Sequence, residues 1–139
     1  MTPTGTWLAF CPADRQISLD DLHQRLSNEP DHSFRREPDR LVITVHDPST
    51  GSSGEVFVEI ESGPAVQRRA TELADLDIVV DDAVPEPDRD LLRRSDLCYK
   101  ISYDLEDPFT VYNTLMFVAG ELMSECAATV FDETNERFV

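Results

Sequence analysis

Alternation of apolar and polar side chains along the chain predicts four β-strands. Residues 40–46, 55–61 and 97–104 carry an apolar side chain at every second position, which is the period of a strand with one buried face. Residues 6–11 are apolar at consecutive positions, and this pattern predicts an inner strand that is covered on both faces. The turn-rich stretch 47–54 then joins two of these strands into a β-hairpin.

A period of three to four residues predicts a long helix in the last third of the chain. This helix is expected to start at Asp107, a good N-cap residue, with Pro108 at the first helical position. Phe117 falls outside its apolar stripe and is expected to be partly exposed or in contact with a second element. The stripe consists of Tyr112, Leu115, Ala119, Leu122 and Cys126, with Val111, Met116, Val118 and Met123 beside them.

Shorter helices are predicted elsewhere. Ser18, followed by Asp21 three residues later, has the form of a capping box and predicts a helix that ends near Asn28. Residues 64–76 and 88–96 also suit helices, because each places its apolar residues on one side. Residues 77–81 suit either a short strand or the tail of the preceding helix.

These elements together predict one α+β domain that covers residues 1–139. Residues 34–39 are expected to be a charged connection, and residues 129–131 and 137–139 are expected to form a small terminal hairpin. Strand–helix–strand units of this kind usually form one sheet. We therefore expect a mixed or antiparallel sheet with helices packed on one face, in a ferredoxin-like core with an insertion. The pattern leaves the strand order open.

The charge of the chain is strongly negative and unevenly distributed. Twenty-eight Asp and Glu against twelve Lys and Arg give a net charge of −16. Residues 1–69 hold eleven acids and seven bases, whereas residues 70–139 hold seventeen acids and five bases. Such a surface repels nucleic acid and anionic membranes and attracts basic proteins. The alternative interpretation is that the acidity only keeps the protein soluble.

Three widely spaced cysteines, Cys11, Cys98 and Cys126, lie within apolar patterns. An odd number without close pairing does not fit a disulfide framework, so buried free thiols are expected. The first residues have neither the basic nor the apolar region of a signal peptide, and a cytoplasmic location is expected.

The sequence predicts no catalytic residue, no metal site and no cofactor. His23, His32 and His46 have no second His and no Cys at a spacing suited to metal ligation. The chain has no glycine-rich phosphate loop, no Gly-x-Ser-x-Gly turn and no Cys-x-x-Cys motif. These observations favour a binding protein over an enzyme.

One acidic cluster has the residue types that hard cations prefer. Carboxylates at this density could bind Ca²⁺ or Mg²⁺, but the spacing lacks the glycine and the closing Glu of an EF-hand loop. A solvated acidic surface and a docking site for a basic protein are the two interpretations ranked above a metal site. The cluster comprises Asp75, Asp77, Asp81, Asp82, Glu86, Asp88 and Asp90.

The excess acidity of the second half predicts a partner-binding surface built from three segments. Nearby aromatic residues would be its anchors, although a core position is the more common role for each. These aromatic residues are Tyr103, Phe109, Tyr112 and Phe131. The acidic residues predicted to contact the partner are Asp75, Asp77, Asp81, Asp82, Glu86, Asp88, Asp104, Glu106, Asp107, Asp132, Glu133 and Glu136.

Three segments of the last third of the chain form a recognisable series: Tyr-Lys-Ile-Ser-Tyr-Asp from residue 99, Val-Tyr-Asn-Thr-Leu from residue 111, and the ending Val-Phe-Asp-Glu-Thr-Asn-Glu-Arg-Phe from residue 130. In these segments the chain resembles small acidic immunity proteins that neutralise bacterial polymorphic and secreted toxins. This resemblance implies a non-catalytic protein that binds a cognate toxin and blocks its active site, often by placing acidic groups in a basic cleft. It identifies no contact residue in this chain.

The leading hypothesis is therefore an immunity or inhibitor protein that binds a basic toxin domain through its acidic surface. The first alternative is a domain that binds a divalent metal or a small ligand through the carboxylates between Asp75 and Asp90. The second alternative is an acidic regulatory domain that associates with itself through the terminal hairpin.

Overall fold

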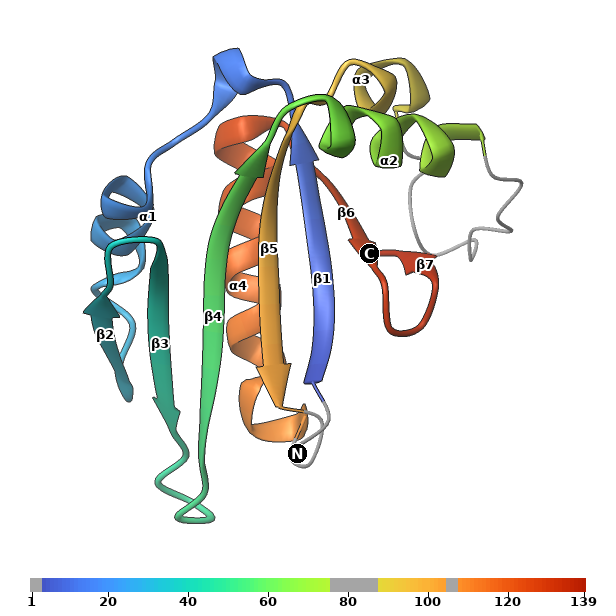
Figure 1. Ribbon diagram of the computed structural model, residues 1–139. Helices are drawn as coiled ribbons and strands as arrows, with labels where there is room; N and C mark the ends of the chain where they lie inside the picture. The colour runs from blue at the N-terminus through green and yellow to red at the C-terminus, as the bar shows by residue number, and fades with distance from the viewer. Residues whose placement is uncertain (1–3, 76–87, 105–107) are drawn as a thin grey trace.

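The computed structural model describes residues 4–75, 88–104 and 108–139, and within them seven strands form one antiparallel sheet (Figure 1). The strands lie in the order β2-β3-β4-β5-β1-β6-β7, and every neighbouring pair is antiparallel. The α+β class predicted from the sequence is confirmed. The strands are β1 (Thr4–Cys11), β2 (His32–Arg36), β3 (Arg40–His46), β4 (Ser53–Ser62), β5 (Leu97–Asp104), β6 (Thr129–Asp132) and β7 (Arg137–Phe138).

Four of the strands form two interleaved units. In the first unit β1 and β4 run parallel with β5 between them, and in the second β5 and β6 run parallel with β1 between them. This interleaving is that of the split strand–helix–strand units of a ferredoxin-like core. The helices are the one-turn η1 (Ala13–Arg15), then α1 (Leu19–Leu26), α2 (Pro64–Asp75), α3 (Arg89–Arg93) and α4 (Pro108–Cys126).

The larger core lies between the sheet and the pair α1 and α4, which cover one face. Alternate residues of β1, such as Trp7 and Ala9, point into it together with Tyr99 and Ile101 of β5. From α4 it receives six buried side chains at helical spacing: Val111, Leu115, Val118, Ala119, Leu122 and Cys126. Figure 1 shows α4 running along the sheet behind β4, β5 and β1.

The expectation that the helices lie on one face holds for α1 and α4 but not for α2 and α3. The intervening residues of β1, Leu8 and Phe10, point to the opposite face and join a second core with Val66 and Leu73 of α2 and Leu92 of α3. Figure 1 places α2 and α3 at the end of the sheet where β1 ends. Strand β1 is therefore covered on both faces, as its consecutive apolar residues predicted.

The segment predicted as a charged connection contains strand β2, which the sequence analysis missed. Its sequence His-Ser-Phe-Arg-Arg has one large apolar residue, so it shows no period of two. Pairing with β3 fixes it at the edge of the sheet, and its Phe34 ring stacks against His23 of α1 at 5.1 Å between centroids. Backbone pairing and side-chain contacts with distant segments hold this strand, and neither is visible as a local pattern.

The remaining predicted elements are found where the structure describes the chain. Ser18 caps α1 by accepting a hydrogen bond from the Asp21 amide at 3.0 Å. Phe117 is partly buried against the larger core, as expected. Strands β6 and β7 form the predicted terminal hairpin, and all three cysteines are buried free thiols. Residues 77–81, with their predicted strand or helical tail, lie outside the described residues.

Candidate functional site

The predicted acidic surface is built around the second core, where α2 and α3 meet the terminal hairpin. Val66, Ala70 and Leu73 of α2 pack in this core with Phe131 and Phe138 of the hairpin. The two phenylalanine rings contact each other edge to face at 5.3 Å between centroids. The described parts of two predicted segments, namely Asp75 with residues 88–90 and residues 132–136, are therefore brought to one side of the molecule.

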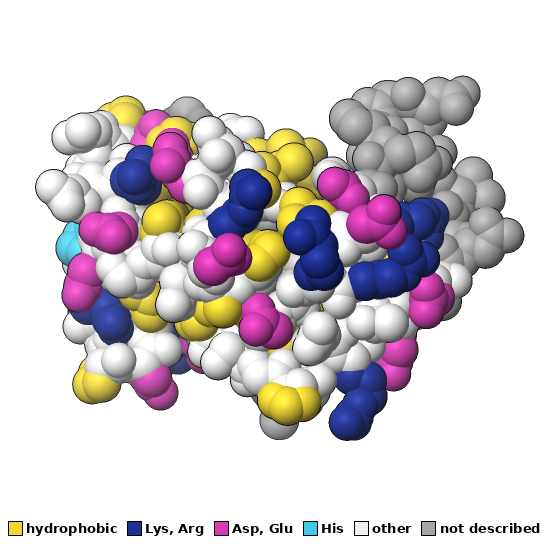
Figure 2. All heavy atoms as spheres, turned by 90° about the horizontal axis from the view of Figure 1, so that it is seen from above, with side chains coloured by type: hydrophobic (Ala, Val, Ile, Leu, Met, Phe, Trp, Pro, Cys, Tyr) yellow, Lys and Arg dark blue, Asp and Glu magenta, His cyan; other side chains and the backbone are white. Residues whose placement is uncertain are grey.

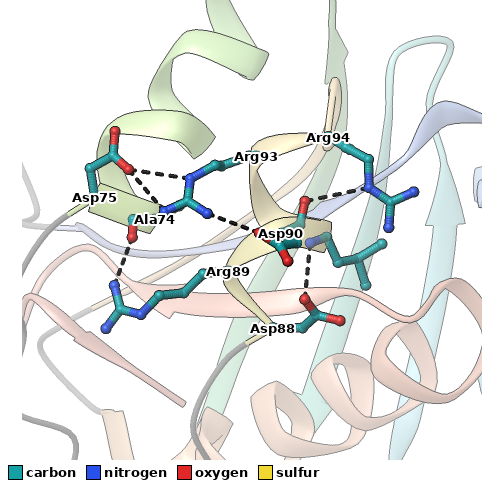
Figure 3. A network of polar contacts seen from close by, with 8 residues as sticks. Ala74, Asp75, Asp88, Arg89, Asp90, Arg93 and Arg94 are labelled. Carbon is teal, nitrogen blue, oxygen red and sulfur yellow. Dashed lines mark hydrogen bonds and ion pairs between the residues drawn. The ribbon is translucent and has the colours of Figure 1, made fainter.

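Arginines of α3 hold the end of α2 in place. Arg93 donates to Asp75 at 3.1 Å and to Asp90 at 3.0 Å, and Arg89 donates to the carbonyl of Ala74 at 2.7 Å. Figure 3 shows the Arg93 guanidinium lying between the two carboxylates while Arg89 reaches Ala74 from the other side. The last turn of α2 is thus tied to α3, and these two helix ends flank residues 76–87 in the chain.

Asp88, another predicted contact residue, has a structural role as the N-cap of α3. Its side chain accepts a hydrogen bond from the Leu91 amide at 3.0 Å. A carboxylate at this position also favours the positive end of the short helix. Asp88 remains exposed to solvent, so its capping role and contact with a partner are compatible.

Across α2 and α3 the described acidic side chains are matched by arginines. Glu72, Asp75 and Asp90 each form an ion pair with Arg69 or Arg93. Seen from above in Figure 2, basic and acidic side chains are interspersed over this end of the molecule. Four further acids of residues 70–90, namely Asp77, Asp81, Asp82 and Glu86, lie outside the described residues.

In the terminal hairpin, the prediction that Asp132 contacts a partner is wrong, because its side chain is 2% exposed. Its carboxylate accepts hydrogen bonds from the backbone amide of Asn135 at 3.1 Å and from the Asn135 side chain at 2.7 Å. Asp132 thus closes the turn between β6 and β7. Glu133 and Glu136 are exposed, and Glu133 lies 3.9 Å from Arg69 of α2.

The described residue of the third predicted segment, Asp104, lies at the opposite end of the sheet from α3. Asp104 is the last residue of β5 and pairs with Thr4, whereas the start of β5, which follows α3, pairs with Cys11 at the other end of the sheet. Glu106 and Asp107 lie outside the described residues. Asp104 is therefore separated from α3 by the length of a strand, but it lies near the terminal hairpin, where Asp132 pairs with Trp7 and the Glu133 amide donates to the Thr6 carbonyl.

Two of the predicted aromatic anchors belong to the core. Tyr103 is 5% exposed and Phe131 is 2% exposed, so neither side chain can insert into a partner. Burial raises the pKa of the Tyr103 hydroxyl, and the neighbouring Asp132 carboxylate raises it further. Tyr112 is exposed on α4, and the side chain of Phe109 lies outside the described part of the chain.

The histidines have structural partners. His32 donates from Nδ1 to the carbonyl of Pro30 and shares a hydrogen bond between Nε2 and the Thr114 hydroxyl, both at 2.7 Å. This contact fixes edge strand β2 to α4. His46 lies 3.2 Å from the Ser53 hydroxyl. Among the described residues no group of three His, Cys, Asp or Glu side chains is placed to hold a metal ion.

A shallow hollow lies between α1, β2 and α4. It comprises about 150 Å³ of space that is open to solvent, and it is lined by mostly apolar side chains that include Leu26, Phe34 and Phe117. Small-molecule sites are concave and bury most of their ligand, so this open hollow does not have the form of a cofactor site. It is an extension of the surface of α4.

The sequence analysis placed Met116 and Met123 beside the core stripe of the long helix, but both are exposed together with Tyr112. The signal that could have identified this face is the lack of charge: residues 108–120 contain no Asp, Glu, Lys or Arg. A helix that is apolar all round needs cover on every side. None of the helices described is both long and apolar enough to cross a membrane.

Comparison of the chain with protein-family models, with curated proteins and with solved structures gives no match in any of the three.

Proposed function

We propose that this chain is a non-catalytic inhibitor of the immunity-protein type, which binds a basic toxin domain in the cytoplasm and blocks it. The observation that carries the proposal is the uneven charge of the sequence, with seventeen acids against five bases in residues 70–139. A coat of charge that served only solubility would not need this concentration.

The arrangement of α2 and α3 supports the proposal. Arg93 and Arg89 engage the carboxylate of Asp75 and the carbonyl of Ala74, so the two helix ends on either side of residues 76–87 are fixed to each other. The sequence between these two helix ends contains four acids: Asp77, Asp81, Asp82 and Glu86. Attachment to a rigid base lowers the entropic cost of presenting charges to a partner.

Electrostatic attraction of this kind has a definite kinetic signature. Opposite charges on two proteins speed their encounter, and dissolved salt screens the attraction over a distance of about 8 Å at physiological ionic strength. Binding of a basic toxin domain should therefore be fast and should weaken as salt is added. Exposed Glu133 and Glu136 would extend the same surface at the hairpin.

The test uses the protein encoded by the gene adjacent to that of this chain, specifically its C-terminal domain. Co-expression should restore growth to cells that this domain poisons, and association rates should be measured as a function of salt. Reversal of Asp81, Asp82 and Glu86 to Lys should slow association at least about tenfold and reduce its salt dependence.

A matched control reverses three exposed acids in the first half of the chain, namely Asp14, Asp39 and Glu55. This control changes the net charge by the same amount, so it separates a local binding surface from overall attraction. Equal slowing in both triple variants would point to overall charge alone. Unchanged affinity and salt dependence in the first variant would refute binding through the acidic segment.

The alternative function is a divalent-metal or small-ligand site that uses the carboxylates between Asp75 and Asp90. Asp75 and Asp88 are already engaged by Arg93 and by the Leu91 amide, which disfavours both as ligands. Calorimetric titration with Ca²⁺, Mg²⁺ and Mn²⁺ discriminates between the two functions. Tight binding of any of these ions, lost when Asp81 and Asp82 are replaced by Asn, would favour the alternative.

A further inference from the structure

The exposed face of α4 gathers the large hydrophobic side chains that are exposed in the part of the chain that the structure describes. All three large hydrophobic side chains that are exposed there lie on this helix: Tyr112 at 53%, Met116 at 42% and Met123 at 44%. They recur four and seven residues apart, so they share one side of the helix. A contiguous apolar face of this kind marks a site of protein contact.

This face also lacks charge in a protein that is otherwise rich in it. From Pro108 to Phe131 the sequence contains two charged residues, Glu121 and Glu125, whereas 29% of the whole chain is charged. Glu125 pairs with Arg25 of α1 at 3.1 Å, at the edge where α1 and α4 meet. The surface between Met116 and Met123 therefore offers a partner no charge to recognise.

Gly120 lies on the same face and has no packing reason within its own chain. A methyl group built on its Cα meets no atom within 4 Å, and the residue is exposed. Glycine in a helix interior costs about 1 kcal/mol relative to alanine. A small residue at such a position lets the backbone of another helix approach closely, as happens where two helices cross.

We propose that this face of α4 joins two copies of the chain in a symmetric dimer, with the two α4 helices crossing at Gly120. Two chains with a net charge of −16 each repel one another wherever their acidic surfaces meet. The uncharged side of α4 is where a second copy can approach without that repulsion. A basic partner, by contrast, gains nothing from a surface without acids.

The positions of the two methionines make the face complementary to itself. Met116 lies four residues before Gly120 and Met123 three residues after it. A two-fold axis through Gly120 with antiparallel helices therefore sets Met116 against Met123 of the partner subunit, and the reverse contact follows from symmetry. Partly buried Phe117 and the hollow beside it extend the apolar contact on the α1 side. The proposed acidic surface at α2, α3 and the hairpin is a different part of the fold.

Sedimentation equilibrium gives the first test. At about 100 μM the chain should sediment at twice its mass of 15.7 kDa, and the fraction of dimer should fall on dilution. Replacing Met116 and Met123 by Glu should weaken the dimer at least about thirtyfold and should leave the circular dichroism of the folded chain unchanged. A wild-type monomer at this concentration, or a dimer that keeps its affinity in the double variant, would overturn the proposal.

Disulfide trapping tests the crossing point itself. Cys11, Cys98 and Cys126 are buried, so a cysteine introduced at Gly120 should be the reactive thiol and should form a cross-linked dimer under mild oxidation. Asn113 is the matched control, because it is exposed on the same face but lies seven residues, about 10 Å, along the helix. In an antiparallel pair its two copies would be roughly 20 Å apart, beyond disulfide reach. Cross-linking of Asn113→Cys but not of Gly120→Cys would overturn the geometry.

Salt separates this inference from the proposed function. Salt screens the repulsion between two acidic chains, so the dimer should become tighter as salt is added. Binding of a basic domain to the acidic segment should weaken under the same conditions. Either result can fail without the other, since Met116→Glu with Met123→Glu alters α4 and the Asp81, Asp82 and Glu86 reversals alter a different segment.

Discussion

Arg93 directs two of its nitrogens at one carboxylate oxygen of Asp75, with Nε at 3.2 Å and Nη2 at 3.1 Å. The remaining nitrogen, Nη1, donates to Asp90 at 3.0 Å (Figure 3). A single side chain of α3 thus ties the last residue of α2 to the first turn of its own helix. These contacts join the two helix ends that precede and follow the acidic segment, residues 76–87.

The first prediction concerns the energy of that tie. Arg93 and Asp75 are 43% and 61% exposed, and an exposed ion pair contributes no more than about 1 kcal/mol because water screens it. Arg93→Gln should therefore lower the free energy of unfolding by at most about 1 kcal/mol in urea titrations. A double-mutant cycle with Asp75→Asn measures the coupling, and Arg68→Gln on the exposed side of α2 is the control. A coupling well above this value would show a buried rather than a surface contact.

The second prediction concerns the loop before α1. The Tyr99 hydroxyl donates to the carbonyl of Ile17 at 2.6 Å and accepts from the Ile17 amide at 2.9 Å. Tyr99→Phe keeps the ring but leaves a partly buried donor and acceptor without this partner, which costs about 1–3 kcal/mol. Thermal and urea unfolding should show this loss. Tyr112→Phe removes a hydroxyl from an exposed ring and should change stability by less than about 0.5 kcal/mol.

The third prediction separates two neighbouring acids of the terminal hairpin. Asp132 is buried and accepts two hydrogen bonds from Asn135, whereas Glu133 is exposed. Asp132→Ala should destabilise the chain by about 1–3 kcal/mol, because the amide of Asn135 loses its acceptor. Glu133→Ala should leave stability within about 0.5 kcal/mol. If both variants had the same stability, the turn would not depend on the Asp132 carboxylate.

Much of the fold could be predicted from the sequence because its strands and helices each have a buried face with a clear period. Strand β1 is the most informative, since its consecutive apolar residues predicted cover on both sides and Leu8 and Trp7 do face different cores. Strand β2 was missed because one apolar residue, Phe34, carries no period. The placement of α2 and α3 on the second face depends on contacts between segments far apart in sequence, which a local pattern does not record.

Less of the candidate site could be predicted, because charge in a sequence does not reveal which charges meet. Asp75 and Asp90 were identified correctly as surface residues, but their pairing with Arg93 follows from the packing of α3 on α2. In the sequence Asp132 does not differ from the other acids of a polar turn, and only the fold shows that its carboxylate accepts a hydrogen bond from the Asn135 amide. The exposed side of α4 was assigned to the core stripe because a helix that is apolar on all sides has no contrast from which to choose the buried one.

The last prediction concerns the buried thiols at alkaline pH. Burial, together with the adjacent Cys126, raises the pKa of the Cys11 thiol from its ordinary value of 9.0 to about 12. Burial likewise raises the pKa of Cys98, which also feels the negative charge of Glu61 on the neighbouring strand. In the unfolded chain these thiols lose their protons near pH 9, whereas the folded chain keeps them protonated.

The sign of the effect follows from that difference. Below pH 9 both states hold the protons and stability is unaffected, but above it deprotonation favours the unfolded chain. The free energy of unfolding should therefore fall as pH rises from about 9 to about 12, as urea midpoints across this range would show. Replacing Cys11 and Cys98 by Ala should flatten this fall at some cost in stability at neutral pH. The native wild-type chain should also resist a thiol reagent at about pH 8 and react only after denaturation, because the thiolate and not the thiol is the nucleophile. Rapid labelling of the folded chain would contradict the burial of these three side chains.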